Sequence, residues 1–149
     1  MPQILLRVRY GGGVSLTIEH INPPAMHTNP AFSRAVTVSG DAKTIIIGAL
    51  DPVDEAGALV GRGDLAAQTE QIFKNLDIIL KATGARLEDI VIWRIFVAQG
   101  QSLQTGAGVF YRWWGTRPNP PANTIVFVPS LGFPDALITL EAVAVVPNV

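Results

Sequence analysis

The segment between Asp64 and Gly84 constrains the fold of this chain more than any other, because its apolar residues recur at steps of three and four. That spacing places side chains on one face of an α-helix. Asp64 can accept hydrogen bonds from the free N–H groups of the first turn, and Gly84 suits the left-handed residue that follows a helix. A helix over residues 64–83 with one apolar face must pack against another layer of structure. The residues of this face are Leu65, Ile72, Phe73, Leu76, Ile79 and Leu80.

Two strand patterns precede the helix. Residues 32–39 alternate weakly between apolar and polar, and residues 44–49 are apolar and rich in β-branched side chains. Gly40 and Asp41 between them form a turn signal. We therefore expect the two strands to pair as a hairpin.

Residues 1–30 are expected to form an arm attached to the main fold, which spans residues 31–149. The arm contains two short strand patterns, at residues 4–8 and 14–18, and then a loop at residues 22–30 with three prolines and two asparagines. Prolines and asparagines at this density favour a loop. We therefore expect a single domain overall.

Strand and helix patterns alternate after the predicted helix. Residues 90–97 are apolar on both faces, which is typical of a central strand. Residues 105–114 are predicted to form a second helix, and residues 124–128 and 136–146 have strand patterns. The order β-β-α-β-α-β-β predicts an α/β (α+β) domain in which both helices pack on one face of a mixed sheet.

Composition and charge restrict the partners of the chain. Of 149 residues, 48% are hydrophobic and 15% are charged, which favours burial at subunit interfaces over a well-filled monomeric core. The net charge of −1, without a run of Lys or Arg, argues against nucleic acid as a partner. No segment approaches the ~20 apolar residues of a membrane span or has the pattern of a signal peptide. We expect a cytoplasmic protein with no membrane association.

Most signals of a metal or covalent site are missing from the sequence. There is no cysteine, which excludes disulfides, thiolate metal ligands and cysteine nucleophiles. His20 and His27 are not spaced with carboxylates as a metal site would be. No serine lies in a nucleophile elbow, and no phosphate-binding loop is present. We therefore expect no metal and no cofactor.

Three polar residues lie within or beside apolar strands. Glu141 must be solvated, paired or protonated there, because burying a lone carboxylate is costly. It is either a catalytic group or a structural carboxylate paired with an arginine such as Arg94. Arg94 itself could bind a carboxylate ligand or form a structural ion pair. Asn123 opens a strand, where it either makes a turn or presents an amide to a ligand.

Several segments together resemble the RidA (YjgF) family. Residues 121–128 and 137–145 resemble the family signature, which runs Pro-Ala-Arg-Ser/Thr, a strand, a short turn, and a strand containing Glu-Ala-hydrophobic-Ala. Residues 64–76, with Gly84 and residues 89–91, resemble the family's first helix and following strand. The resemblance implies a chorismate-mutase-like fold and a homotrimer with ligand clefts between subunits.

The resemblance also implies a chemistry. Active members hydrolyse reactive enamines and imines to carbonyl compounds and ammonia without a metal or cofactor. In them, an arginine grips the substrate carboxylate and a glutamate holds the attacking water. Glu141 matches that glutamate, Gly48 matches a glycine of the first hairpin, and Phe32 falls where an aromatic residue lines the cleft. Asn123 stands at the position of the arginine, and Ile47 at that of a serine.

Replacement of the arginine changes the expected specificity. Asn123 offers a neutral amide in place of a charged two-point grip, so anionic imino acids should bind more weakly by ~1.5–3 kcal/mol, or about ten- to a hundredfold. Ile47 makes the cleft more apolar, and Ala107 stands where the family has an asparagine on the second helix. Arg94 could supply the missing cation.

Two functions follow from these residues. The first is a hydrolytic deaminase of enamines or imines with altered specificity. The second is a non-catalytic, trimeric protein that binds a small metabolite and regulates a partner. Ribonuclease activity is also associated with this family, and the charge balance argues against it here.

Overall fold

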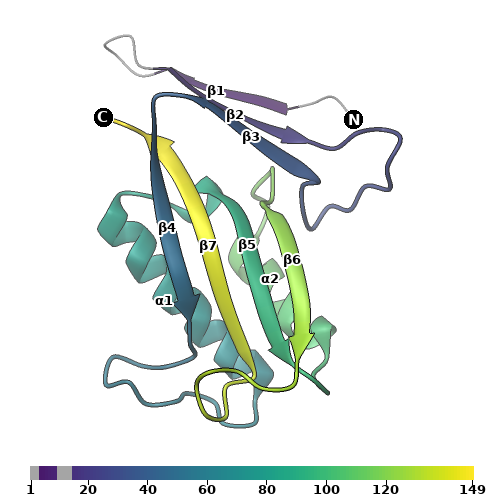
Figure 1. Ribbon diagram of the computed structural model, residues 1–149, viewed down its shortest axis with the longest axis vertical. Coiled ribbons are helices and arrows are strands. Elements are labelled where there is room, and N and C mark those ends of the chain that lie inside the picture. The colour runs from purple at the N-terminus through teal and green to yellow at the C-terminus, as the bar shows by residue number, and fades with distance from the viewer. Residues whose placement is uncertain (1–3, 10–14) are drawn as a thin grey trace.

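The computed structural model describes residues 4–9 and 15–149 of the chain, and side chains from residue 15 onward. Its elements follow the predicted order closely (Figure 1). They are β1 (Ile4–Arg9), β2 (Ser15–Ile21), β3 (Ala35–Gly40), β4 (Ala42–Leu50), α1 (Leu65–Thr83), the 3₁₀ turn η1 (Leu87–Asp89), β5 (Ile90–Ala98), α2 (Leu103–Trp114), β6 (Ala122–Val128) and β7 (Ile138–Pro147).

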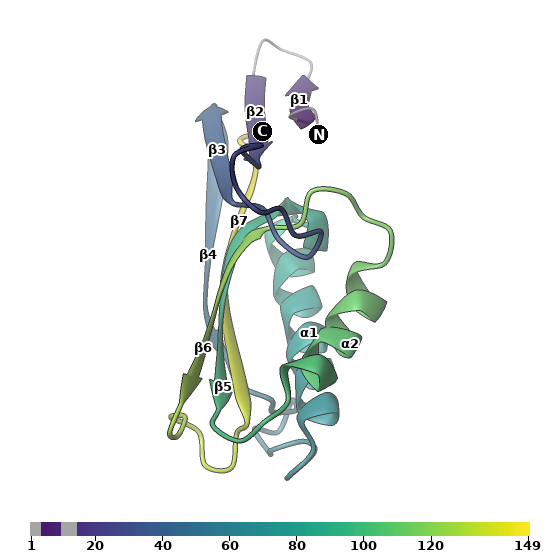
Figure 2. The same ribbon diagram turned by 90° about the vertical axis from the view of Figure 1, so that its right-hand side faces the viewer.

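The strands form two sheets. The small sheet has the order β1-β2-β3, and the large sheet has the order β4-β7-β5-β6. In the large sheet β5 and β6 run parallel, while β7 is antiparallel to both β4 and β5, so the sheet is mixed. Both helices cover one face of the large sheet, and within residues 4–9 and 15–149 no helix covers the other (Figure 2). The predicted mixed sheet with two helices on one face is confirmed.

The first helix begins and ends where the sequence predicts. The Asp64 carboxylate accepts a hydrogen bond from the Ala67 backbone N–H at 3.0 Å, and Gly84 adopts a φ of +78°. The second helix starts at Leu103, two residues before the predicted start, and runs through Gly106 and Gly108. Glycine weakens a helix by about 1 kcal/mol relative to alanine, but packing against the sheet overrides that preference here.

The core lies between the large sheet and the helices. Trp93 of β5 is 2% exposed and forms its centre. Its ring meets Phe73 of α1 edge-on at a centroid distance of 6.1 Å, and Phe110 of α2 edge-on at 5.4 Å. Trp114 packs on the same ring at 6.1 Å. Because β5 lies between β7 and β6, its prediction as a central strand is confirmed.

The predicted hairpin of residues 32–39 and 44–49 is wrong. Strand β3 pairs with β2 in the small sheet, whereas β4 pairs with β7 in the large one. At the corner between them Gly40 has a φ of +99°, and a Cβ on it would lie 2.0 Å from the carbonyl oxygen of Ser15. Asp41 donates its backbone N–H to the same oxygen at 3.1 Å. Strand β2 therefore takes the edge of β3 that β4 was expected to use.

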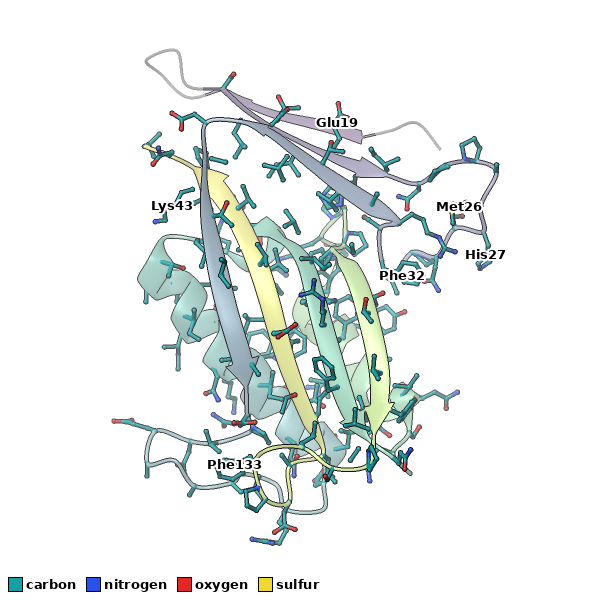
Figure 3. All side chains as sticks on the ribbon, in the orientation of Figure 1. Glu19, Met26, His27, Phe32, Lys43 and Phe133 are labelled. Atoms are coloured by element: carbon teal, nitrogen blue, oxygen red, sulfur yellow. The ribbon has the colours of Figure 1, made fainter. Side chains whose placement is uncertain are left out.

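Residues 15–21 are integrated into the sheet structure through β2. Leu16 and Ile18 are buried and form a second, smaller core with Val145 of β7. The loop that follows carries Met26 and His27 on its outside and returns toward the sheets at Phe32 (Figure 3). The boundary of an arm at residue 30 stays a prediction. Among the helices of the described residues, none has the length and apolar character needed to cross a membrane.

Candidate functional site

The predicted site residues lie on two opposite faces of the large sheet. Side chains alternate between the faces of a strand, so neighbours in sequence point in opposite directions. Asn123 of β6 is in register with the buried Trp93 and shares its helix-covered face. Arg94 of β5 is in register with Glu141 of β7 and lies on the uncovered face. One subunit therefore does not bring Asn123 and Glu141 into one site.

Arg94 and Glu141 form an ion pair on the uncovered face. The Arg94 Nη1 atom lies 3.2 Å from Glu141 Oε1, and the two side chains are 48% and 35% exposed. An exposed pair of this kind contributes only about 0–1 kcal/mol to stability. Among the described residues no donor binds the second carboxylate oxygen of Glu141. That oxygen remains available for a water or a substrate.

The surroundings of this pair are apolar. Alternation along each strand places Ile46, Phe96, Val126 and Val143 on the same uncovered face, each from a different strand. Ile46 is 82% exposed and Val126 is 39% exposed. Contiguous apolar surface of this kind is typical of an interface. Glu141 and Arg94 thus lie within a mainly apolar patch, in which Thr124 and Thr139 are neutral polar neighbours.

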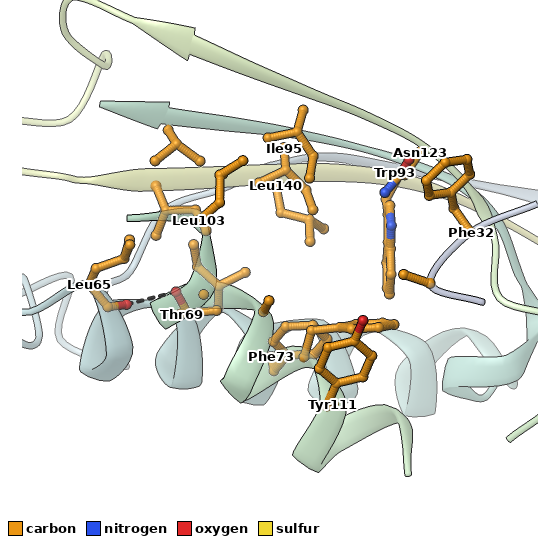
Figure 4. Close-up of a pocket in the computed structure, with 18 of the residues that line it drawn as sticks. Phe32, Leu65, Thr69, Phe73, Trp93, Ile95, Leu103, Tyr111, Asn123 and Leu140 are labelled. Carbon is orange, nitrogen blue, oxygen red and sulfur yellow. Dashed lines mark hydrogen bonds between the residues drawn. The ribbon is translucent and has the colours of Figure 1, made fainter. Parts of the chain in front are cut away.

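A cavity of about 390 Å³ lies on the other side, between the sheet and the two helices. The strands contribute Trp93, Ile95 and Leu140, and the helices contribute Phe73 and Tyr111 from the opposite side (Figure 4). These side chains make a mainly apolar wall. A cavity of this size suits a small organic molecule.

The two ends of the cavity differ in chemistry. Asn123 and Phe32 lie at one end, and Leu65 and Leu103 lie at the other (Figure 4). Within residues 15–149 the Asn123 amide has no hydrogen-bond partner. In contrast, the Thr69 hydroxyl, which also lines the cavity, donates to the Leu65 carbonyl at 2.7 Å. Asn123 is therefore a polar group that is free to hold a ligand at its end of the cavity.

The remaining predicted site residues are placed differently. Ile47 is 3% exposed within the main core and does not line the cavity. Gly48 lies exposed on β4 with open space where a Cβ would be. Ala107 does line the cavity, from α2. Phe32 lines it from the loop before β3, and the Arg34 guanidinium lies 5.1 Å above its ring.

Sequence reasoning missed the aromatic wall of the cavity. The sequence predicts Trp93 only as part of a strand, and Phe110 and Tyr111 only as parts of a helix, because aromatic residues in such elements usually fill a core. The signal that could have pointed to a cavity is the pair of small residues Gly106 and Ala107, which leave α2 without bulk opposite the sheet. Small residues alone predict close packing as readily as a cavity.

Two linked hydrogen bonds lie next to the end of the cavity that carries Phe32 and Asn123. The Ser33 hydroxyl donates to the Pro120 carbonyl at 2.5 Å, so its oxygen accepts from His20 Nδ1 at 2.8 Å. Burial lowers the pKa of the His20 imidazole below its usual range. Ser33 adjoins Phe32, and Pro120 lies three residues before Asn123. These two hydrogen bonds therefore connect the two segments that carry the polar end of the cavity.

The described residues hold no group of three or more His, Asp or Glu side chains arranged to bind a metal ion. The polar side chains of the two faces of the large sheet differ in charge. On the uncovered face they include the carboxylate of Glu141 and the guanidinium of Arg94. In the cavity they are neutral amide and hydroxyl groups.

Comparison with known proteins identifies the family. The sequence profile of the endoribonuclease L-PSP family matches residues 24–146. The chain belongs to this family, the RidA/YjgF family. A solved structure from the conserved Rid family of Yersinia pestis, YyfB, has a TM-score of 0.75 and 32% identity, covering 87% of this chain and 98% of that one. The YjgF gene product of E. coli has a TM-score of 0.62 and 30% identity, over 68% of this chain and 80% of its own.

A curated relative of this family carries a named activity. The 3-aminoacrylate deaminase RutC of Acinetobacter baylyi is 29% identical over 117 residues, which are 78% of this chain and 90% of that protein. A RutC family protein of Pyrococcus abyssi is 27% identical over 113 residues, 76% of this chain and 84% of its own length. The predicted family membership is confirmed by these matches.

Proposed function

We propose that this Rid-family protein hydrolyses small enamines or imines to carbonyl compounds and ammonia, with a specificity altered by Asn123. The observation that carries the proposal is the half-exposed Glu141 carboxylate, held by Arg94 with one oxygen unoccupied, at the position of the family's water-holding glutamate. The deaminase named among the relatives supports the reaction class.

The chemistry requires a positioned base. Glu141 accepts a proton from a water molecule, and the water oxygen forms a bond to the imine carbon as the C=N electron pair moves to nitrogen. Glu141 returns the proton to nitrogen, which gives a carbinolamine. Transfer of the carbinolamine's hydroxyl proton to nitrogen, as its O–H electron pair forms the C=O bond and the C–N bond breaks, then releases ammonia and leaves a carbonyl compound. An enamine enters the same sequence after protonation at carbon converts it to the imine form. Arg94 uses Nη1 to orient Glu141, and its other N–H groups can bind the substrate.

The proposed assembly is a homotrimer. The uncovered apolar face would pack against neighbouring subunits, and clefts between the subunits would unite Glu141 of one subunit with Asn123 and Phe32 of another. Gly48, exposed at the edge strand β4, would contribute backbone polar groups to such a cleft. Ile47, which is buried in the core, would act on the cleft only by supporting that strand. A cytoplasmic location and independence from cofactors stay predictions of the sequence.

The test is ammonia release from imines generated in situ by an amino-acid oxidase, over a panel of anionic and neutral imines. Loss of a positioned general base lowers the rate by about 10²–10⁴-fold, so Glu141→Gln should show a loss in that range. Glu19→Gln is the matched control, because Glu19 is a strand carboxylate on the small sheet and accepts a hydrogen bond from Thr37 Oγ1 at 3.4 Å. Equal rates for both variants would contradict the proposal.

The uncharged cavity favours a second candidate, a trimeric protein that binds a small metabolite without converting it. Ligand binding without ammonia release across the whole panel would support this candidate. Glu141 would then be a structural carboxylate paired with Arg94. Turnover that disappears in Glu141→Gln would exclude it.

A further inference from the structure

We propose that the cavity between the large sheet and the helices binds an uncharged molecule with a ring-like apolar body and one hydrogen-bonding group, and that Asn123 sets this preference. The inference rests on the proposed function in taking Asn123 and Phe32, which lie at one end of the cavity, as ligand-binding residues. It adds the chemical class of the ligand.

The first argument is the charge of the walls. Among the described residues that line the cavity, none is Asp, Glu, Lys, Arg or His. A carboxylate entering it would lose its hydration without gaining a cation, which is costly. Arg34 is close to the mouth, but its guanidinium lies over the Phe32 ring and its Nε donates to the His27 carbonyl at 3.0 Å. Arg94 lies on the opposite face of the sheet.

The second argument is the arrangement of aromatic rings. Phe73, Trp93, Phe110 and Tyr111 all contribute to the walls. Trp93 and Phe110 already meet at an interplanar angle of 86°, so a ring between sheet and helix would find both ring faces and ring edges. Aromatic groups prefer such edge-to-face and offset contacts. A ring-bearing ligand therefore fits this lining better than a flexible chain of polar groups.

The third argument is Asn123. Its amide offers both a donor and an acceptor, and within residues 15–149 it has no hydrogen-bond partner. It lies at the end of the cavity opposite Leu65 and Leu103 (Figure 4). A neutral group such as an amide, ketone or imine at that end would complete the amide's hydrogen bonds, while the apolar body would lie toward the leucines.

The room for the ligand depends on α2. Gly106 lines the cavity, and a Cβ on it would lie 3.9 Å from Thr69 Oγ1, at ordinary contact distance. A larger side chain at this position would extend into the cavity. Gly108, on the same helix, is exposed, and nothing lies within 4 Å of its Cβ position. The two glycines therefore form a matched pair for testing occupancy.

The experiment compares benzamide with benzoate, which have nearly the same shape and differ in charge at neutral pH. Binding to the full chain is measured by tryptophan fluorescence, since Trp93 lines the cavity, and by amide chemical shifts of residues 103–111 and 123–125. We expect benzamide to bind at least about tenfold more tightly than benzoate. Direct binding is measured apart from ammonia release, so failure of the proposed function does not affect this readout.

Variants test which residues cause the preference for benzamide over benzoate. Asn123→Leu should weaken benzamide about five- to tenfold, and Asn123→Arg should reverse the preference in favour of benzoate. Gly106→Leu should abolish binding of both probes, whereas Gly108→Leu should leave both affinities unchanged. Tighter or equal binding of benzoate by the unchanged chain overturns the inference. So does an absence of benzamide binding up to its solubility limit, or a benzamide affinity that neither Asn123→Leu nor Gly106→Leu alters.

Discussion

The two faces of the large sheet differ in enclosure and in charge although the same strands supply both. The helix-covered face is apolar and enclosed, with a cavity whose polar side chains, Asn123 among them, are uncharged. The uncovered face is apolar and exposed, with the Arg94–Glu141 ion pair within it. The uncharged cavity and the ion pair therefore lie on opposite sides of one sheet.

The difference shows that adjacent residues on one strand point to opposite faces of the sheet and so contact different groups. Trp93 and Arg94 are neighbours in sequence, but one supports the cavity and the other supports the carboxylate. If both faces belong to one active site, a second subunit has to bring them together. The predictions below separate the roles of the two faces.

The largest effect is expected on the uncovered face, from Ile46→Asp. If this face is buried between subunits, the change places an unpaired carboxylate in each interface, at a cost of several kcal/mol per subunit. The trimer should dissociate, as measured by light scattering or native mass spectrometry. In an isolated subunit Ile46 is 82% exposed, so the monomer should keep its fold. An unchanged mass would show that the face is not an interface.

The next largest effect is expected on the covered face, from Trp93→Ala. Removing a buried aromatic ring that touches Phe73, Phe110 and Trp114 should lower the free energy of unfolding by about 3–5 kcal/mol. Denaturant-induced unfolding measures it. The matched truncation on the other face is Val126→Ala, made in the Ile46→Asp monomer, where Val126 is 39% exposed and we expect a change within about 0.5 kcal/mol. Similar losses for both would contradict the contrast between the faces.

The third prediction concerns the pH dependence of the free energy of unfolding, through His20, which binds Ser33 next to the Phe32 end of the cavity. Because burial lowers the pKa of His20, the unfolded chain takes up a proton below its ordinary value near 6.5 while the folded chain does not. The free energy of unfolding should therefore fall as the pH decreases below about 6.5, by at most about 1.4 kcal/mol per pH unit, and level off below the folded pKa. His20→Leu should remove this dependence. His27→Gln, at an exposed loop position, should retain it.

The smallest expected effect is the coupling between Arg94 and Glu141. In an exposed setting a double-mutant cycle of Arg94→Met and Glu141→Gln should give about 0.2–1 kcal/mol. Burial of the pair in an assembly should raise the coupling, to about 1.5 kcal/mol or more for close pairs at interfaces. Measuring the cycle in the Ile46→Asp monomer and in the unchanged assembly distinguishes the two settings. Equal coupling in both would place the pair outside any interface.

The sequence by itself determined the elements and their order. The helix after Asp64 is local, since a cap residue, a repeat of 3.6 and a terminal glycine all act within a few residues. Periodicity also identified β5 as a central strand, and short motifs identified the family. Glu141 and Asn123 could be selected because a polar residue in an apolar strand stands out locally.

Tertiary structure decided which segments meet. The pairing of β3 with β2, and not with β4, depends on a close approach of Gly40 to Ser15, residues that are far apart in sequence. The cavity exists because small residues of α2 face a strand of another segment, a juxtaposition that no local pattern encodes. The separation of Asn123 from Glu141 follows from alternation combined with strand order. Register across a sheet is set by nonlocal packing, so only the folded chain fixes which polar groups share a face.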